Sequence, residues 1–277
     1  MSALLTAASI AQFAAAPPVA AASDLLPDFK MAPVYDVSME RGSNGKVRLR
    51  FGTIVWNIGQ GPIEVRGSHR VKRKMTVLKQ VLHRSDGGTR TIAGPPGIAA
   101  FFSGDHHDHW HISNFVIVSL YKVPTTGGPP PSDVRHLKKI GFCLTDLVRV
   151  PEALRPPNSG GRQYPYTGCG NSSSTKFKMG LAVGWGDDYK PWFAYQSVGI
   201  TGLAAGNYRM CVTPNAGGAW LESTIANNSS WVDLAIDISQ NKVTVLAHGE
   251  TECQPGATTA PSIVATGPGI DGGLTLH

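Results

Sequence analysis

The apolar residues of this chain fall in short runs that are closed by turn-forming residues. Among 277 residues there are 32 Gly and 20 Pro, and these cluster with Asn between runs rich in Val and Ile. No long stretch has the periodicity of a helix, so we expect an all-β fold, an antiparallel β-sandwich with long loops in a single domain. The expected strands include residues 47–51, 54–58, 63–65, 75–83, 138–144, 196–201, 207–214, 231–238 and 242–247.

One expected strand changes its hydrophobic phase partway along. Residues 47–51 place apolar side chains at odd positions, whereas the other phase dominates in residues 54–58. The change falls at Gly52 and Thr53 and predicts a β-bulge or tight bend there. Residues 151–175, rich in Pro, Gly, Ser and Asn, are interpreted as a loop.

The first 23 residues are interpreted as a signal-like or disordered segment. Residues 2–22 are rich in Ala and carry no charge, and the small residues 20–23 precede Asp24 like a signal-peptide cleavage site. The first basic residue is Lys30, so a basic n-region is missing. Pro17 and Pro18 argue against a membrane-spanning helix. We expect a secreted or extracytoplasmic protein with no membrane span, a folded domain at 24–250 and a disordered tail at 251–277.

Four cysteines fit an exported protein. Their spacing matches neither a zinc ribbon nor a redox CxxC motif, so we read them as two disulfides among three permitted pairings. Sequence proximity favours Cys143–Cys169 and Cys211–Cys253. Four reduced, buried cysteines in a cytosolic protein are the alternative.

The net charge of +6 is modest for this length, and the basic residues are scattered apart from Arg66 to Lys74. We interpret the run at 70–74 as a solvated loop or edge strand rather than a polyanion site. The composition therefore predicts no nucleic-acid partner.

Metal-ligand chemistry is concentrated at residues 105–111, which contain four of the nine histidines. In a strand, successive side chains alternate faces, so His107, His109 and His111 project to one side. Three imidazoles suit zinc, copper, iron or nickel, and Cu(II) is favoured by nitrogen-rich sites. A surface run that binds adventitious metal is the alternative.

Several blocks in order resemble the lysyl oxidase family. Residues 107–111 (His-Asp-His-Trp-His) resemble its copper-binding segment, residues 24–28 its opening Asp-Leu-Val-Pro-Asp, and residues 139–144 its Lys-x-x-Phe-Cys-Leu. Residues 180–189 resemble its Gly-Leu-Ser-Pro-Gly-x-x-Asp-x-Tyr, in a form closer to the microbial members. The blocks at 206–208 and 221–228 extend the likeness, which implies a lysyl-oxidase-like catalytic domain at 24–250.

The resemblance implies a redox cofactor built from the chain itself. In the family, lysine tyrosylquinone forms from one Lys and one Tyr, which correspond to Lys139 and Tyr189. Asp187 corresponds to the family's aspartate near the tyrosine and is the candidate base. For Asp188, beside it, an exposed turn residue is an equally good interpretation. Without the family match, Lys139 reads as a solvated strand lysine and Tyr189 as a core aromatic.

A second metal site is also implied by the resemblance. Asp24, Glu222, Asn227 and Asn228 correspond to a calcium site, and oxygen donors are what calcium selects. The family's acidic residue two positions after the glutamate is Thr224 here. Asn227 and Asn228 otherwise read as an ordinary turn.

The implied function is a copper- and quinone-dependent amine oxidase. It would use O₂ to convert primary amines, either peptidyl lysine or small amines, to aldehydes with release of hydrogen peroxide and ammonia. Two other classes stay open, a non-enzymatic secreted copper-binding β-sandwich and a zinc hydrolase that uses the same histidines.

Overall fold

The described chain folds into two antiparallel β-sheets. The computed structural model describes residues 21–68, 75–92, 97–102, 108–123, 135–251 and 253. The strands of the larger sheet are β1 (Asp24–Leu25), β5 (Ile63–Ser68), β6 (Met75–Arg84), β7 (Thr89–Thr91), β8 (Gly97–Phe102), β9 (His109–Lys122), β10 (Arg135–Phe142), β12 (Lys176–Leu181), β15 (Gly206–Pro214), β16 (Ser230–Asp237) and β17 (Lys242–Gly249). Those of the smaller sheet are β2 (Phe29–Met31), β3 (Tyr35–Arg41), β4 (Val47–Asn57), β11 (Val148–Arg149), β13 (Trp185–Tyr189) and β14 (Ser197–Gly199). Two short 3-10 helices, η1 (Glu152–Leu154) and η2 (Tyr166–Cys169), lie in the segment predicted to be a loop.

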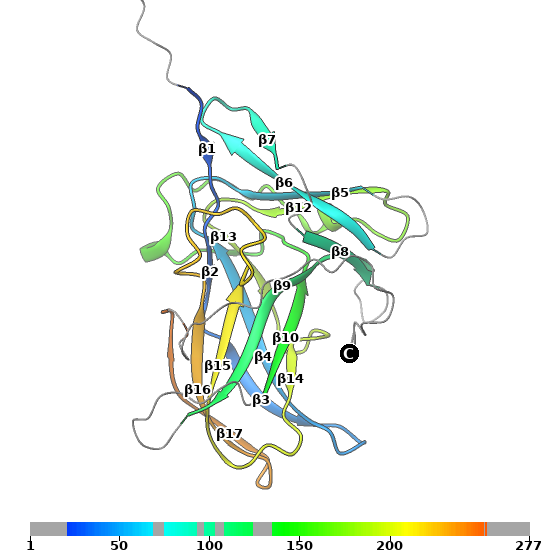
Figure 1. Cartoon of the computed structure of the whole chain (residues 1–277), viewed down its shortest axis with the longest axis vertical. Helices are drawn as coiled ribbons and strands as arrows, with labels where there is room; N and C mark the ends of the chain where they lie inside the picture. Colours follow the sequence, from blue (N-terminus) through cyan, green and yellow to red (C-terminus); the bar gives the residue numbers. More distant parts are fainter. Residues whose placement is uncertain are drawn as a thin grey trace, which may run out of the picture.

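The strands of each sheet follow an order that differs from their order in the sequence. The larger sheet runs β12-β5-β6-β8-β9-β15-β16-β17, with β1 and β7 on β6 and β10 on β9. The smaller sheet runs β11-β13-β4-β14, with β2 and β3 also paired to β4. In Figure 1, β5, β6 and β12 cross the top of the molecule at a steep angle to β15 and β16 below. The predicted all-β sandwich is confirmed.

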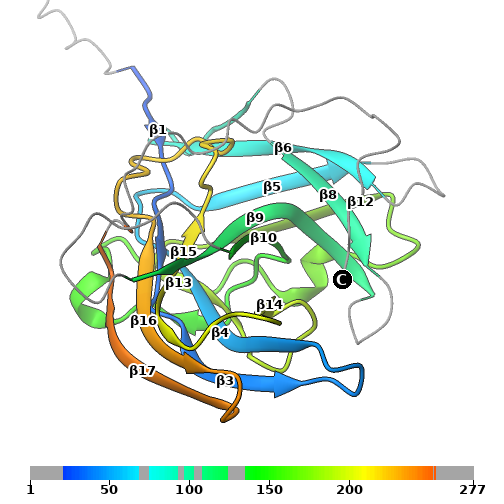
Figure 2. The same ribbon diagram turned by 60° about the horizontal axis from the view of Figure 1, so that its bottom comes forward.

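Strand β9 links the two ends of the larger sheet. Its first part pairs with β8, where Ile112 lies opposite Ala99, and its second part pairs with β15 from Val116 to Lys122. Between these parts Asn114 has a φ of 56°, a left-handed conformation that asparagine tolerates better than most residues. Figure 2 shows β9 curving between β8 and β15, so its first residues lie where the sheet changes direction.

Strand β4 runs unbroken through the predicted irregularity. Its residues up to Gly52 pair with β3 and β14, and the residues from Thr53 onward pair with β13 and β2. The shift of register lies on the partner strand, between Tyr35 and Ser38 of β3, where Asp36 has a φ of 50°. The change of hydrophobic phase in β4 thus marks a change of partner strands, and the bulge itself forms in β3.

Aromatic side chains join the two sheets. The rings of Phe29 on β2 and Phe115 on β9 meet edge to face at 5.1 Å, and Phe115 in turn contacts Phe142 at 5.8 Å. On β4, the odd-numbered Leu49 and Phe51 are fully buried, as their spacing predicts. Burial of each such side chain contributes roughly 1.5–3 kcal/mol to folding, so the core fixes the relative position of β4, β9 and β10.

Two disulfides connect distant segments. Cys143 bonds to Cys169, and Cys211 bonds to Cys253, which confirms the pairing favoured by sequence proximity. The first bond joins the end of β10 to η2, and the second joins β15 to the segment after β17. Such bonds persist in oxidising compartments, so they are compatible with an extracytoplasmic protein.

Three of the expectations concern residues that lie outside the described ranges. These are residues 1–20 of the signal-like segment, the basic run at 70–74 and nearly all of the tail after residue 251. Within the described ranges, no helix has the length and apolarity needed to cross a membrane.

Substitution of Gly52 should destabilise the fold, because an added Cβ would overlap the ring of Tyr35 on β3. We expect Gly52→Ala to lower the free energy of unfolding by about 1–3 kcal/mol, the usual range for overpacking. Chemical denaturation measures this change. Gly199→Ala on the neighbouring β14 is the matched control, because a Cβ there meets nothing within 4 Å. Equal stability of the two variants would contradict the packing argument.

Candidate functional site

Two of the predicted histidine ligands converge at the start of β9. His109 and His111 are both buried, and their Nε2 atoms lie 2.8 Å apart. Trp110 between them points to the opposite face and stacks on Phe177 at 5.0 Å, as the two-residue period of a strand predicts. The predicted third ligand, His107, lies outside the described residues.

The paired imidazoles fit a transition metal. Imidazole nitrogen is a good ligand for transition metals such as copper and zinc. The two Nε2 atoms lie 2.8 Å apart, at hydrogen-bond distance from each other, so both rings direct a nitrogen to the same place. Within the described ranges no three His, Cys, Asp or Glu side chains group together to hold a metal ion. The described part of the site therefore supplies two nitrogen donors.

Tyr166 fixes the orientation of His109. Its hydroxyl lies 2.7 Å from Nδ1 of His109, and the two rings meet edge to face at 4.8 Å. A partner on Nδ1 leaves Nε2 facing the other histidine, which is how outer groups usually orient metal ligands. Sequence reasoning missed Tyr166 because it lies in the loop segment. The sequence offered one indication of its role. Tyr166 lies three residues before Cys169, and the disulfide of Cys169 with Cys143 brings η2 to the end of β10.

Tyr189 lies next to the histidines although it is far from them in sequence. It is buried at the end of β13, and its hydroxyl accepts a hydrogen bond of 2.8 Å from the backbone N–H of Cys143. Its ring packs on Phe142 at 4.2 Å and faces the ring of His111 at 6.1 Å. Burial, together with the nearby Asp187, raises the pKa of the Tyr189 hydroxyl well above its usual value.

Asp187 is a fully buried carboxyl on the same strand. One of its oxygens accepts a hydrogen bond of 3.3 Å from Thr145, and the other has no hydrogen-bond partner within the described residues. Burial raises the pKa of this carboxyl well above its usual value, and the neighbouring Asp188 and Asp146 act in the same direction. A buried carboxyl with a raised pKa is suited to hold or exchange a proton.

Asp188 is not an exposed turn residue. It lies within β13 with 6% of its surface exposed, because the alternation of the strand turns it away from Asp187 and into the protein. The hydroxyl of Tyr35 and the ammonium of Lys190, at 2.5 Å, both donate to its carboxylate. Lys190 thus compensates the charge of Asp188, whereas Asp187 has no ion pair within the described residues and keeps one oxygen without a hydrogen-bond partner.

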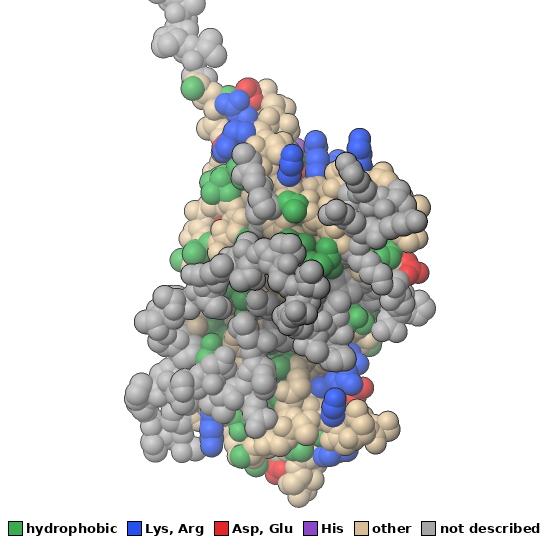
Figure 3. Space-filling view, turned by 45° about the vertical axis from the view of Figure 1, so that its right-hand side comes forward, with side chains coloured by type: hydrophobic (Ala, Val, Ile, Leu, Met, Phe, Trp, Pro, Cys, Tyr) green, Lys and Arg blue, Asp and Glu red, His purple; other side chains and the backbone are tan. Residues whose placement is uncertain are grey.

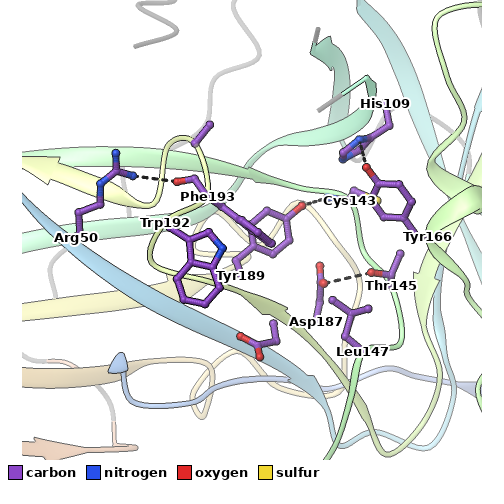
Figure 4. Close-up of a pocket in the computed structure, with 12 residues that line it drawn as sticks. Arg50, His109, Cys143, Thr145, Leu147, Tyr166, Asp187, Tyr189, Trp192 and Phe193 are labelled. Carbon is purple, nitrogen blue, oxygen red and sulfur yellow. Dashed lines mark hydrogen bonds between the residues drawn. The ribbon is translucent and has the colours of Figure 1, made fainter. Parts of the chain in front are cut away.

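These groups line a cavity of about 700 Å³, shown in Figure 4. In that view His109 and Tyr166 lie on one side, Tyr189 and Asp187 lie in the middle, and Trp192 and Phe193 lie on the other side. Trp192 is 69% exposed, so an indole stands at the mouth of the cavity. The lining residues are Arg50, His109, Cys143, Thr145, Leu147, Tyr166, Asp187, Asp188, Tyr189, Trp192, Phe193 and Ala194.

The structure describes only the backbone of Lys139. Its Cα is paired with that of Ile117 on β9, within the strand β10 that ends at Phe142. The same strand touches both partners of the site, because Phe142 packs on Tyr189 and a Cβ at Gly141 would lie 3.2 Å from the Cβ of His111. The backbone carrying Lys139 thus belongs to a strand that contacts both Tyr189 and the start of β9.

Of the four residues assigned to calcium, Glu222 and Asn228 contact each other, Asn227 is the chain neighbour of Asn228, and Asp24 makes an ion pair elsewhere. The buried Glu222 accepts hydrogen bonds from Asn228 at 2.8 Å and from Asn215 at 2.6 Å. Asn227 donates to Asp28 at 2.9 Å, whereas Asp24 forms an ion pair with Arg90. The side-chain oxygens of Asn227 and Asn228 are buried and have no hydrogen-bond partner within the described residues. Such oxygens are suitable donors for a hard cation, and the nearby carboxylate is that of Asp28.

Comparison with known proteins adds no assignment. No family model matches the chain, and no curated protein matches it.

Removal of the Tyr166 hydroxyl should weaken metal binding, because His109 would lose the partner that orients its ring. We expect Tyr166→Phe to reduce Cu(II) affinity by about 10–100-fold, the usual effect of losing such a partner. Competition with a chelator of known affinity measures this. Tyr121→Phe, at the far end of β9, should leave affinity unchanged. An unchanged affinity in Tyr166→Phe would show that Tyr166 does not position a metal ligand.

Glu222 should make the stability of the metal-free protein depend on pH. Burial raises its pKa from 4.5 to about 7, so the native state keeps a proton that the unfolded chain loses. The stabilising contribution is complete below pH 4.5 and is lost as the pH rises through 7. Relative to Glu222→Gln, the wild type should lose about 1–3 kcal/mol of unfolding free energy across this range. The measurement is chemical denaturation of both proteins at a series of pH values. The same pH dependence of the unfolding free energy in both proteins would contradict the assignment.

Proposed function

We propose that the protein is a secreted copper- and quinone-dependent amine oxidase of the lysyl oxidase type. It would convert primary amines, peptidyl lysine or small amines, to aldehydes and release hydrogen peroxide and ammonia. The observation that supports this most is the meeting of His109 and His111 with the buried Tyr189 at one cavity. A metal-ligand pair beside a shielded tyrosine is what metal-assisted oxidation of that tyrosine requires.

In this proposal His107, His109 and His111 bind copper, and Lys139 and Tyr189 form lysine tyrosylquinone. Together the two cofactors supply the two-electron oxidation of the amine, with O₂ as the acceptor. The donors fit, because copper binds imidazole nitrogen well and the two described Nε2 atoms point to the same place.

The protein's own groups have separate tasks. Tyr166 holds His109 by its Nδ1 atom, and the backbone N–H of Cys143 holds the oxygen of Tyr189. Both contacts place reactive groups before substrate arrives, which removes part of the entropic cost of reaction. Burial of Tyr189 and Phe142 also keeps water away from the ring that is to be oxidised.

Asp187 is the proposed proton acceptor of the reaction. It lines the cavity two residues before Tyr189, and burial raises its pKa. A carboxyl with a raised pKa is a stronger base once ionised, which suits removal of a proton from carbon. Asp188 does not fit this role, because Tyr35 and Lys190 already occupy its oxygens.

We also propose that calcium binds near Glu222, Asn227 and Asn228. The two buried amide oxygens and the carboxylates of Glu222 and Asp28 supply oxygen donors. Asp28 replaces Asp24 in this set, since Arg90 neutralises Asp24. Such a site would tie the loop before β16 to the segment before β2 and would serve the fold rather than the reaction.

The proposal predicts the behaviour of cofactor variants. Copper-loaded wild type should release hydrogen peroxide from a primary amine and should show a visible absorbance that shifts with phenylhydrazine. Lys139→Ala and Tyr189→Phe should each lose both signals, because each removes one half of the quinone. Lys138→Ala, one residue away on β10, is the matched control and should keep both.

Other outcomes distinguish the alternatives. Full activity in Lys139→Ala or Tyr189→Phe would refute the cofactor assignment. Copper binding without reactivity towards phenylhydrazine would favour a non-enzymatic copper-binding protein. Zinc in the purified protein, with hydrolysis and no oxidation, would favour a hydrolase that uses the same histidines.

A further inference from the structure

A row of basic side chains crosses three neighbouring strands on the outer face of the larger sheet. Lys178 on β12 lies directly opposite Arg66 on β5, and Arg66 lies directly opposite Lys79 on β6. All three side chains are exposed, as is Lys176, two residues before Lys178. Neighbouring strands are about 4.8 Å apart, so the row spans about 10 Å.

This arrangement is unfavourable without a counter-charge. Like charges directly opposite one another on neighbouring strands destabilise a sheet. Within the described ranges, Arg66 has an ion pair with Glu64 at 2.5 Å, but Lys79, Lys176 and Lys178 form none. Lys178 lies 5.6 Å from the ring centre of Tyr164, a contact that leaves its positive charge in place. Three cations are therefore available to an anionic ligand.

The row borders a hollow of about 740 Å³. Among its apolar lining residues the half-exposed Val77 offers a surface beside the lysines, whereas Gly67 and Phe177 are buried and the Phe177 ring stacks on Trp110. In Figure 3, Lys and Arg side chains are visible at the top of the molecule, the end at which Figure 1 shows β5, β6 and β12, and others lie near the lower end. The surface therefore combines a line of positive charge with one exposed apolar side chain, that of Val77.

A buried carboxylate anchors the centre of the row. Glu64 lies under Arg66. It accepts a hydrogen bond of 3.0 Å from Tyr164, and it contacts Nε2 of His83 at 3.3 Å. Burial alone would raise the pKa of Glu64, but its hydrogen bonds with Arg66, Tyr164 and His83 outweigh that effect and lower the pKa. The carboxylate thus stays ionised and fixes the guanidinium at the middle of the groove.

We propose that the groove formed by this row and the hollow beside it binds an anionic polysaccharide, with carboxylate or sulfate groups along the row and the apolar face of a sugar ring on Val77. The lining favours this polymer over single-stranded nucleic acid, because its one aromatic residue, Phe177, is only 6% exposed and offers no surface for stacking bases. The disulfides are compatible with the extracytoplasmic setting in which such polysaccharides occur. The inference is independent of the proposed amine oxidation, since it uses different residues.

The test is binding of alginate and heparin oligosaccharides to the full, disulfide-intact chain by titration calorimetry. The groove variant combines Lys79→Gln, Lys176→Gln and Lys178→Gln and retains Arg66, whose bond to Glu64 supports the fold. The matched control combines Lys46→Gln, Lys122→Gln and Lys242→Gln, three exposed lysines elsewhere, with the same loss of charge. We expect the groove variant to bind at least about tenfold more weakly, from the sum of three exposed charge contacts.

The control variant should bind as tightly as the wild type, within about twofold, because its lysines lie outside the groove. Equal weakening in both triple variants would overturn the site and leave only an effect of net charge. Failure of the wild type to bind either oligosaccharide would also overturn the proposal. Tighter binding to single-stranded DNA or to anionic lipid vesicles than to either oligosaccharide would overturn the choice of ligand.

Discussion

Cys143 forms a disulfide with Cys169 and donates its backbone N–H to the hydroxyl of Tyr189. The disulfide carries η2 to the end of β10, and the first residue of η2, Tyr166, contacts His109. One residue therefore connects the tyrosine on the smaller sheet with the histidines on the larger sheet. Substitution of Cys143 would break the disulfide that holds η2, whereas the hydrogen bond to Tyr189 uses the backbone N–H and needs only that the end of β10 keeps its place.

The cavity forms where the two sheets meet, and this explains its unusual electrostatics. Strand β13 brings Asp187 and Tyr189 from the smaller sheet, while β9 and β10 cover them from the larger sheet. Charged groups enclosed in this way lose contact with water, so the pKa values of the Asp187 carboxyl and the Tyr189 hydroxyl both rise. The basic groove lies on the outer face of the sheet, where Lys79 and Lys178 stay exposed. One fold thus carries a cavity with buried ionisable groups and an open charged surface.

Local patterns in the sequence predicted those features that depend on neighbouring residues. The two-residue period put His109 and His111 on one face, and proximity paired the cysteines correctly. Features that depend on strand register were not predictable in this way. The bulge formed in β3 opposite Gly52, and Asp188 was buried because β13 pairs with β4. Likewise, the pairing of β1 with β6 sets Asp24 opposite Arg84, which draws Asp24 into ion pairs and leaves Asp28 near the asparagines.

In the proposed function, Lys139 and Tyr189 become one cofactor, lysine tyrosylquinone, next to copper. Peptide mass spectrometry of protein loaded with copper and exposed to O₂ tests this claim most directly, because it needs no substrate. We predict one cross-linked pair of peptides that contains both residues, absent from protein prepared without copper. Recovery of the two peptides separate and unmodified after loading with copper and O₂ would contradict the account.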